Sequence, residues 1–264
     1  MKRGRSGFTL IEVALFLAIT GILFVGIAVG TQNSIYQQRF NDAVQNFAEY
    51  LRTAYSEVTN VRNESFGRSD KAIYGKLITF GENHDLAGAS IPSEQVGSSI
   101  FSYNVIGDIR EESANDALEA LAYLNANVVI KEDGAYQPVG FADDYKPKWA
   151  SAIQKHDSKD SFTGALLIVR HPDSGTIYTF VKDDGAIQVN EAIKNGSEDS
   201  LNNLLKSQLT NGSFALKAVD FCVNPNGLGE GGLRRDVRVV ENARNGTGIE
   251  IIGDDADGCG RVED

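Results

Sequence analysis

The chain begins with a nearly continuous apolar stretch, and its apolar residues are unevenly spread over the 264 positions. Between residues 8 and 30 the non-apolar positions are Thr9, Glu12, Thr20 and the glycines. A helical run of about 22 apolar residues is long enough to cross the hydrocarbon core of a bilayer. After Thr31 the mixture of polar and apolar residues is typical of a soluble domain. We therefore expect one N-terminal hydrophobic helix followed by one soluble domain.

Helical periodicity continues beyond the apolar run. Apolar residues recur at spacings of three and four from Tyr36 to Val61, and no glycine or proline interrupts residues 31–65. This pattern predicts an amphipathic helix with one apolar stripe. A single helix from Phe8 to about Arg62 would be about 80 Å long. Two helices with a bend near Gly30 are the alternative.

From Ser65 onward the pattern changes to short strands and loops. The clearest signal is a hairpin, with strands at 165–171 and 176–182 and a Pro-Asp-Ser-Gly turn between them. We predict further strands at 72–80, 100–106, 127–131, 187–189, 214–223, 233–240 and 248–252, and short helices at 111–124 and 198–209. The whole pattern predicts an α+β fold, in which the long helix packs on an antiparallel β-sheet head formed as a single domain by residues 63–264.

The charge of the chain is strongly negative, with 36 acidic against 25 basic residues and a formal net charge of −11. Such a surface argues against general nucleic-acid binding, which depends on neutralising phosphates. The first seven residues oppose this trend, since they contain Lys2, Arg3 and Arg5 and no acid. By the positive-inside rule, these three cations would hold the N-terminus in the cytoplasm.

Two ordinary interpretations of the N-terminus leave something unexplained. A secretory signal peptide ends in a small-residue cleavage site after its apolar stretch, and no clear A-x-A site follows this one. A plain transmembrane anchor fits the length but does not explain Glu12. An acidic residue inside a membrane helix costs about 2.5–3.5 kcal/mol on insertion scales, and less near an end.

A third interpretation accounts for Glu12. Gly7 is followed by Phe8-Thr9-Leu10-Ile11-Glu12 and then by an apolar helix that contains Ala18-Ile19-Thr20-Gly21-Ile22-Leu23. This stretch resembles the signal of type IV prepilins and type II secretion pseudopilins. The resemblance implies that residues 1–7 are a leader, which a membrane-embedded prepilin peptidase removes by cutting between Gly7 and Phe8 before it methylates Phe8.

The resemblance also implies an architecture and a function. Residues 8–30 would form a transmembrane and filament-core helix, and residues 31–62 the amphipathic stalk. The head would lie outside the cytoplasmic membrane until an assembly platform and its ATPase build the subunit into an extracellular filament with copies of itself or other pilins. Glu12 would then neutralise the Phe8 amine of a neighbouring subunit, because an unpaired buried charge is costly. A secretion pseudopilin, or a minor pilin for initiation, adhesion or DNA uptake, is the alternative.

One feature departs from the family pattern. Many type IV pilins have a proline where this chain has Val29, and here no proline precedes Pro92. Gly21, Gly26 and Gly30 would supply helix flexibility instead, since glycine destabilises a helix by about 1 kcal/mol relative to alanine.

Enzymatic motifs are missing from the sequence. It contains no H-E-x-x-H zinc motif, no G-x-S-x-G nucleophile elbow and no phosphate-binding loop. His84, His156 and His171 do not have the spacing of metal ligands, and we expect them to be solvated. We therefore predict no catalytic site and no required cofactor.

Three weaker candidate sites lie near the C-terminus. Cys222 and Cys259 are the two cysteines of the chain, and with an exported head we expect a disulfide between them, with two free thiols as the alternative. The carboxylates at Asp254, Asp255 and Asp257 have a spacing that suits calcium, and some pseudopilins bind calcium in this region. A solvated acidic tail is the simpler interpretation.

The third candidate is a basic cluster at Arg234, Arg235 and Arg238, with Arg244 nearby. Some minor pilins used in natural transformation bind DNA through C-terminal arginines, and these side chains have the charge to contact phosphates. Solvent-facing arginines on an edge strand are the alternative, and nearby acidic residues favour it.

Overall fold

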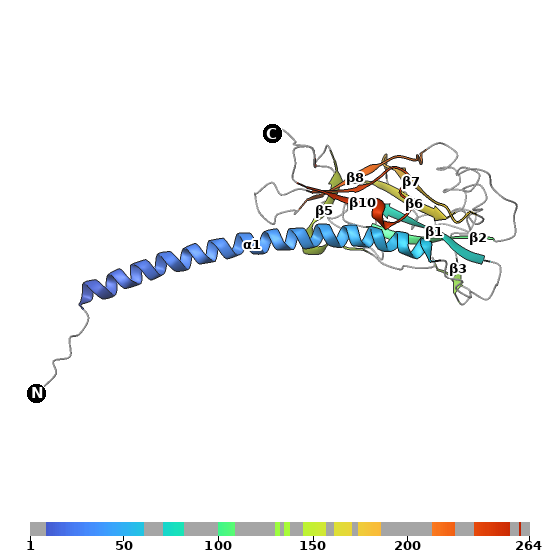
Figure 1. The fold of residues 1–264 in the computed structure, drawn as a ribbon. Helices are drawn as coiled ribbons and strands as arrows, with labels where there is room; N and C mark the ends of the chain where they lie inside the picture. Colours follow the sequence, from blue (N-terminus) through green and yellow to red (C-terminus); the bar gives the residue numbers. More distant parts are fainter. Residues whose placement is uncertain are drawn as a thin grey trace, which may run out of the picture.

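The computed structural model describes residues 9–60, 71–81, 100–108, 130–132, 135–137, 145–156, 161–170, 174–185, 213–224, 235–253 and 259. Within these residues, one long helix runs beside two antiparallel four-stranded sheets (Figure 1). The predicted α+β fold, with a long N-terminal helix on antiparallel strands, is therefore confirmed. The division of the strands into two sheets is a feature that the sequence pattern did not indicate.

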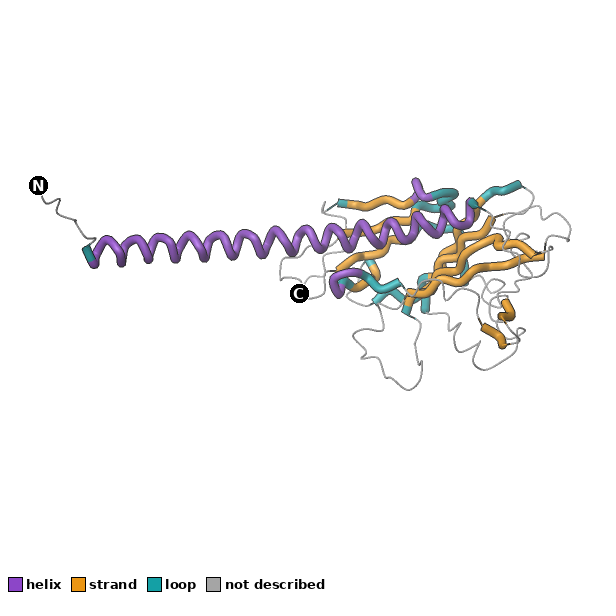
Figure 2. The backbone as a smooth tube through the Cα atoms, turned by 90° about the horizontal axis from the view of Figure 1, so that it is seen from below, coloured by secondary structure: helices purple, strands orange, loops and turns teal. Residues whose placement is uncertain are grey.

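Helix α1 spans Leu10–Thr59 without interruption, as expected for one long helix rather than two. Backbone carbonyls in its last turn have hydrogen-bond donors, because the Asn60 N–H donates to the Ser56 carbonyl at 3.0 Å and Arg170 Nη1 donates to the Thr59 carbonyl at 2.7 Å. A cation at this end also interacts favourably with the helix dipole. The first half of α1 projects beyond the head, whereas its second half lies along the sheets (Figure 2).

The two sheets are antiparallel throughout. The first sheet has the order β2-β1-β6-β7, formed by β1 (Lys71–Phe80), β2 (Ile100–Asp108), β6 (Gly164–Arg170) and β7 (Ile177–Lys182). The second has the order β10-β9-β8-β5, formed by β5 (Ala152–Lys155), β8 (Val219–Asn224), β9 (Arg235–Val239) and β10 (Ile249–Ile252). A small pair, β3 (Ile130–Glu132) with β4 (Ala135–Gln137), and two 3-10 turns, η2 (Lys148–Ala150) and η3 (Gly246–Gly248), complete the elements.

Six of the predicted strands lie within two residues of their expected positions, but the one at 214–223 starts late, at Val219. Ala215 instead exchanges both backbone hydrogen bonds with Val181 of β7, at 2.9 and 3.0 Å. The chain therefore leaves the first sheet at Ala215 and enters the second at Val219, which shortens β8. Strand β5 was not predicted. The expected helices at 111–124 and 198–209 and the strand at 187–189 lie outside the described residues, as does most of the strand at 127–131.

The second half of α1 supplies one side of the hydrophobic core. Its buried side chains follow the predicted stripe, at Phe40, Ala43, Val44, Phe47, Ala48, Leu51, Ala54, Tyr55 and Val58. The Tyr55 hydroxyl donates at 2.7 Å to the Thr179 hydroxyl, because Thr179 in turn donates to the Ala243 carbonyl at 2.7 Å. This buried chain of hydrogen bonds connects α1 to β7 and to the segment before β10.

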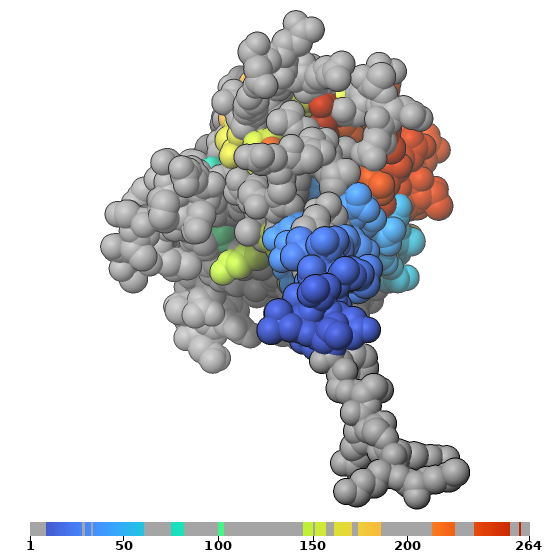
Figure 3. Space-filling view, turned by 90° about the vertical axis from the view of Figure 1, so that its left-hand side faces the viewer, coloured from blue at the N-terminus to red at the C-terminus, as the bar shows by residue number. Residues whose placement is uncertain are grey.

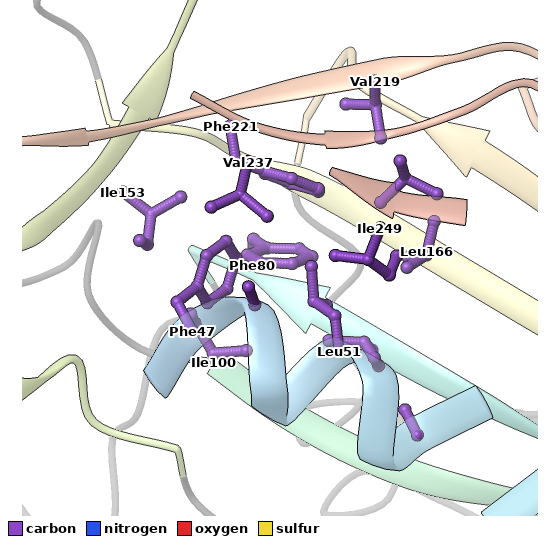
Figure 4. Packing of buried hydrophobic residues seen from close by; sticks show 14 of the residues in the cluster. Phe47, Leu51, Phe80, Ile100, Ile153, Leu166, Val219, Phe221, Val237 and Ile249 are labelled. Atoms are coloured by element: carbon purple, nitrogen blue, oxygen red, sulfur yellow. The ribbon is translucent and has the colours of Figure 1, made fainter. Parts of the chain in front are cut away.

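An aromatic cluster joins the helix to both sheets (Figure 4). Phe80 of β1 stacks on Phe221 of β8, with ring centroids 4.9 Å apart, and Phe47 of α1 meets Phe221 edge-on at 5.5 Å. Phe162 contacts both Phe80 and Phe221, at 5.1 and 4.8 Å. The two sheets and the second half of α1 therefore share one core, and that core sets where the first half of the helix leaves the head.

Candidate functional site

The start of α1 is defined by two side chains of the N-terminal motif. Thr9 is the N-cap residue, and its hydroxyl accepts the Glu12 backbone N–H at 3.3 Å. Glu12 reaches back, so that its Oε2 accepts the Thr9 backbone N–H at 2.8 Å and the Thr9 hydroxyl at 2.9 Å. This reciprocal arrangement is a capping box, which satisfies donors that a helix start leaves without partners.

The Glu12 carboxylate still has capacity for another donor. Both bonds from Thr9 go to Oε2, and Oε1 has no hydrogen-bond partner among the residues that the structure describes. Glu12 also lies in the first turn, where a negative charge interacts favourably with the positive end of the helix dipole. The capping box can therefore hold the Glu12 carboxylate in a fixed orientation and leave its Oε1 atom available to a cation.

The residues that follow Glu12 form an exposed apolar surface. Phe16 is 69% exposed and Phe24 is 71% exposed, and neighbouring leucines, isoleucines and valines are similar. The helix is long and apolar enough to cross a membrane by length and composition. Apolar surface of this extent marks a region that another apolar phase or protein covers.

A folded head on a helix whose first half is apolar and exposed is the arrangement of a protein anchored by one N-terminal helix. Residues 2–28 match the family model of the prokaryotic N-terminal methylation motif. The chain therefore carries the signature of type IV pilins and pseudopilins, as the resemblance implied. The match covers the leader region and the first part of α1, and the head lies outside it. No curated protein and no solved structure matches the chain.

A buried disulfide lies at the other end of the chain. Cys222 of β8 is bonded to Cys259, with Cα atoms 5.3 Å apart across a sequence separation of 37 residues. Closing such a loop stabilises a fold by about 4 kcal/mol on the chain-entropy model. Cys222, Asp236 and Cys259 are donor types that suit a metal, but the two sulfurs are bonded to each other. In this state, the cluster fastens the C-terminal segment to the second sheet.

Asp236 of β9 is the polar centre of this cluster, and its side chain is completely buried. Its Oδ2 accepts the Cys259 backbone N–H at 2.8 Å and lies 2.8 Å from His156 Nδ1. Burial raises the pKa of the Asp236 carboxyl, and the contacts with Cys259 and His156 oppose that shift. The expectation that His156 is simply solvated is therefore wrong, because this partly buried ring pairs with a carboxylate.

The candidate DNA-binding arginines have different surroundings. Arg238 donates from Nε and Nη2 to the two carboxylate oxygens of Asp220, at 2.6 and 2.8 Å, from directly opposite positions on β9 and β8. Arg235 lies half-buried on the same strand, Arg244 is exposed, and Arg234 lies outside the described residues. A guanidinium held by both oxygens of a carboxylate has fewer donors left for phosphates. Arg238 is therefore best explained as one half of a cross-strand ion pair.

The remaining sequence-based candidates fall where the structure gives no description. Gly7 and Phe8, the expected cleavage site, precede the first described residue. Asp254, Asp255 and Asp257, the candidate calcium ligands, lie in the gap before Cys259.

Sequence reasoning missed two polar groups of these sites for different reasons. Thr9 had a readable signal, because Thr9 and Glu12 have the T-x-x-E spacing of a capping box. Asp236 had no local signal, because its partners His156 and Cys259 lie 80 and 23 residues away in the chain.

Proposed function

We propose that this chain is a structural subunit of a type IV pilus-like extracellular filament, without catalytic activity or a required cofactor. The prepilin peptidase cuts between Gly7 and Phe8 and methylates Phe8. Before assembly, the subunit is anchored in the cytoplasmic membrane with its head outside the cytoplasm. The assembly platform and its ATPase then move it into a filament with copies of itself or other pilins. The observation that carries this proposal is the methylation motif at residues 2–28, continued by the exposed apolar half of α1.

The geometry at Glu12 supports a specific assembly contact. Cleavage creates a cationic amine at Phe8, which needs a negative partner once it is buried among apolar helices. The capping box holds Glu12 through Oε2 and leaves Oε1 for that amine on a neighbouring subunit. Thr9 remains after cleavage, so the mature chain retains both residues of the box.

A type II secretion pseudopilin, or a minor pilin, is the second candidate, because the same motif is the signature of both pilins and pseudopilins. The genes beside this one distinguish them. A retraction ATPase favours a pilus, whereas an outer-membrane secretin with secretion partners favours a pseudopilin.

Two variants separate the charge of Glu12 from its role in the cap. Glu12→Gln retains a side chain that can complete a capping box but removes the negative charge. Thr9→Val removes the cap and keeps the charge. Removing one partner of a buried pair costs about 3–5 kcal/mol, so we expect at least a roughly hundredfold loss of sheared filaments for Glu12→Gln, with leader cleavage unchanged. A lost cap costs about 1 kcal/mol, so Thr9→Val should reduce filaments by less than about tenfold.

Filaments at wild-type levels from Glu12→Gln would refute the pairing with the Phe8 amine. A loss of filaments from Thr9→Val that exceeds the loss from Glu12→Gln would show that assembly depends on the cap more than on the charge.

A further inference from the structure

The base of the head, where α1 leaves it, combines positive charge with an exposed aromatic ring. We use the name basal patch for Arg39 of α1 together with Lys146, Lys148 and Trp149 from the segment before β5. The Arg39 guanidinium carbon lies 4.8 Å from the Trp149 ring centroid. Lys146 and Lys148 are exposed, and Trp149 is 45% exposed. Arg39 and Lys148 therefore place two cations beside one exposed indole, in a chain whose net charge is −11.

The segment that supplies Trp149 descends along α1 toward the apolar half of the helix. Tyr145 stacks on Tyr50 with ring centroids 4.3 Å apart, whereas Trp149 lies against Arg39. The 11 positions between Tyr50 and Arg39 correspond to about 16 Å along a helix axis. Trp149 therefore lies nearer than Tyr145 to the apolar half of α1. Seen from the N-terminal side, residues 145–156 (yellow-green) lie beside the blue helix (Figure 3).

Arg39 is the first charged residue that follows the apolar run. No charged residue lies between Glu12 and Arg39 in the sequence. Arg39 is about 13 Å along the helix beyond Gly30, where the apolar run ends. The headgroup zone adds about 5–8 Å to each side of the hydrocarbon core, and helix side chains point back toward the N-terminus. The long side chain of Arg39 therefore reaches toward the headgroups when the apolar half spans a bilayer.

The backbone at Trp149 adopts a costly conformation that leaves the indole exposed. Its φ of 59° and ψ of 35° lie in the left-handed region, which residues other than glycine rarely adopt. The turn is held because the Ser151 N–H and hydroxyl both donate to the Lys148 carbonyl, at 3.2 and 2.8 Å. Strained residues of this kind cluster at functional sites.

The described acidic side chains that line the groove beside Trp149 follow Arg39 along α1. Asp42 and Glu49 line the shallow groove beside Trp149, but both follow Arg39 along α1, and Glu49 pairs with Arg52 at 3.6 Å. Along this described part of α1, the charged side chains therefore change from acidic at Glu49 and Asp42 to basic at Arg39 toward the apolar half of the helix. Tryptophan is enriched at membrane interfaces, and lysine and arginine are attracted to anionic lipid surfaces.

We propose that the basal patch docks onto the anionic phospholipid headgroups of the leaflet from which the head emerges. The inference rests on the membrane-stored state proposed above. Docking holds the acidic head against the bilayer in one orientation, and assembly must break this contact when the subunit leaves the membrane. The patch lies about 13 Å along α1 beyond the end of the apolar run, and its charge is complementary to the lipid.

Trp149 is the single tryptophan of the chain, so its fluorescence reports on the patch directly. We would reconstitute the full chain in phosphatidylcholine vesicles with and without phosphatidylglycerol. Phosphatidylglycerol should shift the emission to shorter wavelength and make it quenchable by lipids brominated close to the headgroup. Added salt should reverse both effects, because it screens exposed charges.

Two variants measure the electrostatic part of this contact. The apparent docking constant is the equilibrium constant between the undocked and docked head, read from the Trp149 emission. Each basic residue near an anionic surface strengthens binding to that surface, so Lys148→Gln should weaken this constant about fivefold. Arg244→Gln is the control. It removes one exposed charge near Gly246, which lies against Arg52 farther along α1, and should leave the constant unchanged.

Three outcomes would overturn the inference. Equal emission and quenching in both lipids, with the chain inserted, would leave the proposed function intact and remove lipid docking. A change that follows protein concentration and not lipid charge would assign the patch to a second copy of the chain. A chain that an alkaline wash removes from the vesicles would contradict the membrane-stored state itself, and docking with it.

Discussion

At the scale of single residues, Asp236 stands out among the described residues of the head, because its carboxyl group is completely buried. Its carboxylate lies beside the Cys222–Cys259 disulfide, and its contacts come from His156 and from the Cys259 backbone. Burial of a carboxylate favours its neutral form and raises its pKa. The folded head therefore binds this proton more tightly than the unfolded chain does. The consequence is a stability that depends on pH in a direction opposite to that of most carboxylates.

We predict that stability contributed by Asp236 is complete below its unfolded pKa of 3.8 and is lost as pH rises through its raised folded pKa. Each unit of pKa difference is worth about 1.4 kcal/mol. Asp236→Asn cannot titrate, so its free energy of unfolding should lack this decline above about pH 4. Urea unfolding of the full chain in detergent across this range measures it.

Asp184→Asn is a suitable control for that experiment. Asp184 is exposed, and its hydrogen bond with Lys182 lowers its pKa, so its contribution is lost only as pH falls below the ordinary value of 3.8. Above about pH 4 this variant should follow the wild type. Parallel pH profiles for Asp236→Asn and the wild type would contradict the account of Asp236.

At the scale of elements, α1 has two halves with different surroundings. The second half contributes Phe47 to the aromatic cluster with Phe80 and Phe221, whereas the first half exposes Phe16 and its apolar neighbours. One element therefore belongs both to the head core and to the anchoring region. The same substitution should have different effects in the two halves.

We expect Phe47→Ala to lower the free energy of unfolding of the head by about 3–5 kcal/mol, because it leaves a cavity where helix and sheets meet. Phe16→Ala removes the same side chain from the exposed half and should change head stability by less than about 0.5 kcal/mol. Unfolding of both variants in detergent, followed by circular dichroism, measures the difference. Similar losses would show that the first half of α1 also packs on the head.

The elements that the sequence predicted well are those with local signals. The spacing of apolar residues from Tyr36 to Val61 predicted the helix, and the alternation and turn residues around 165–182 predicted the hairpin of β6 and β7. The division into two sheets was not predictable in this way. It depends on Ala215 pairing with Val181 and on β5 pairing with β8, contacts between residues far apart in the chain.

Candidate sites follow the same rule. The N-terminal motif is a short, contiguous pattern, so Glu12 was identified from the sequence as the charged group of the site, and only its partner Thr9 was overlooked. Trp149 and Arg39 are 110 positions apart and acquire meaning only when the fold brings them together. Neither residue has a local pattern that indicates the contact.

At the scale of the whole molecule, a long apolar surface and an acidic head lie at opposite ends. Removal of residues 1–7 leaves 22 basic and 36 acidic residues, so the mature chain carries a net charge of −14. The apolar half of α1 cannot remain in water, since exposed apolar surface of this size is covered by a membrane or by other helices. In the proposed function, the bilayer covers this apolar surface first, and neighbouring subunits cover it after assembly.

We propose that leader removal converts a membrane protein into a filament subunit whose first residue is Phe8. Mass spectrometry of the N-terminal peptide, from protein made in a host with its prepilin peptidase, tests this most directly. We expect a peptide that begins at Phe8 and carries one methyl group on its amine. An intact Met1, or a cut C-terminal to the apolar half of α1, would contradict it.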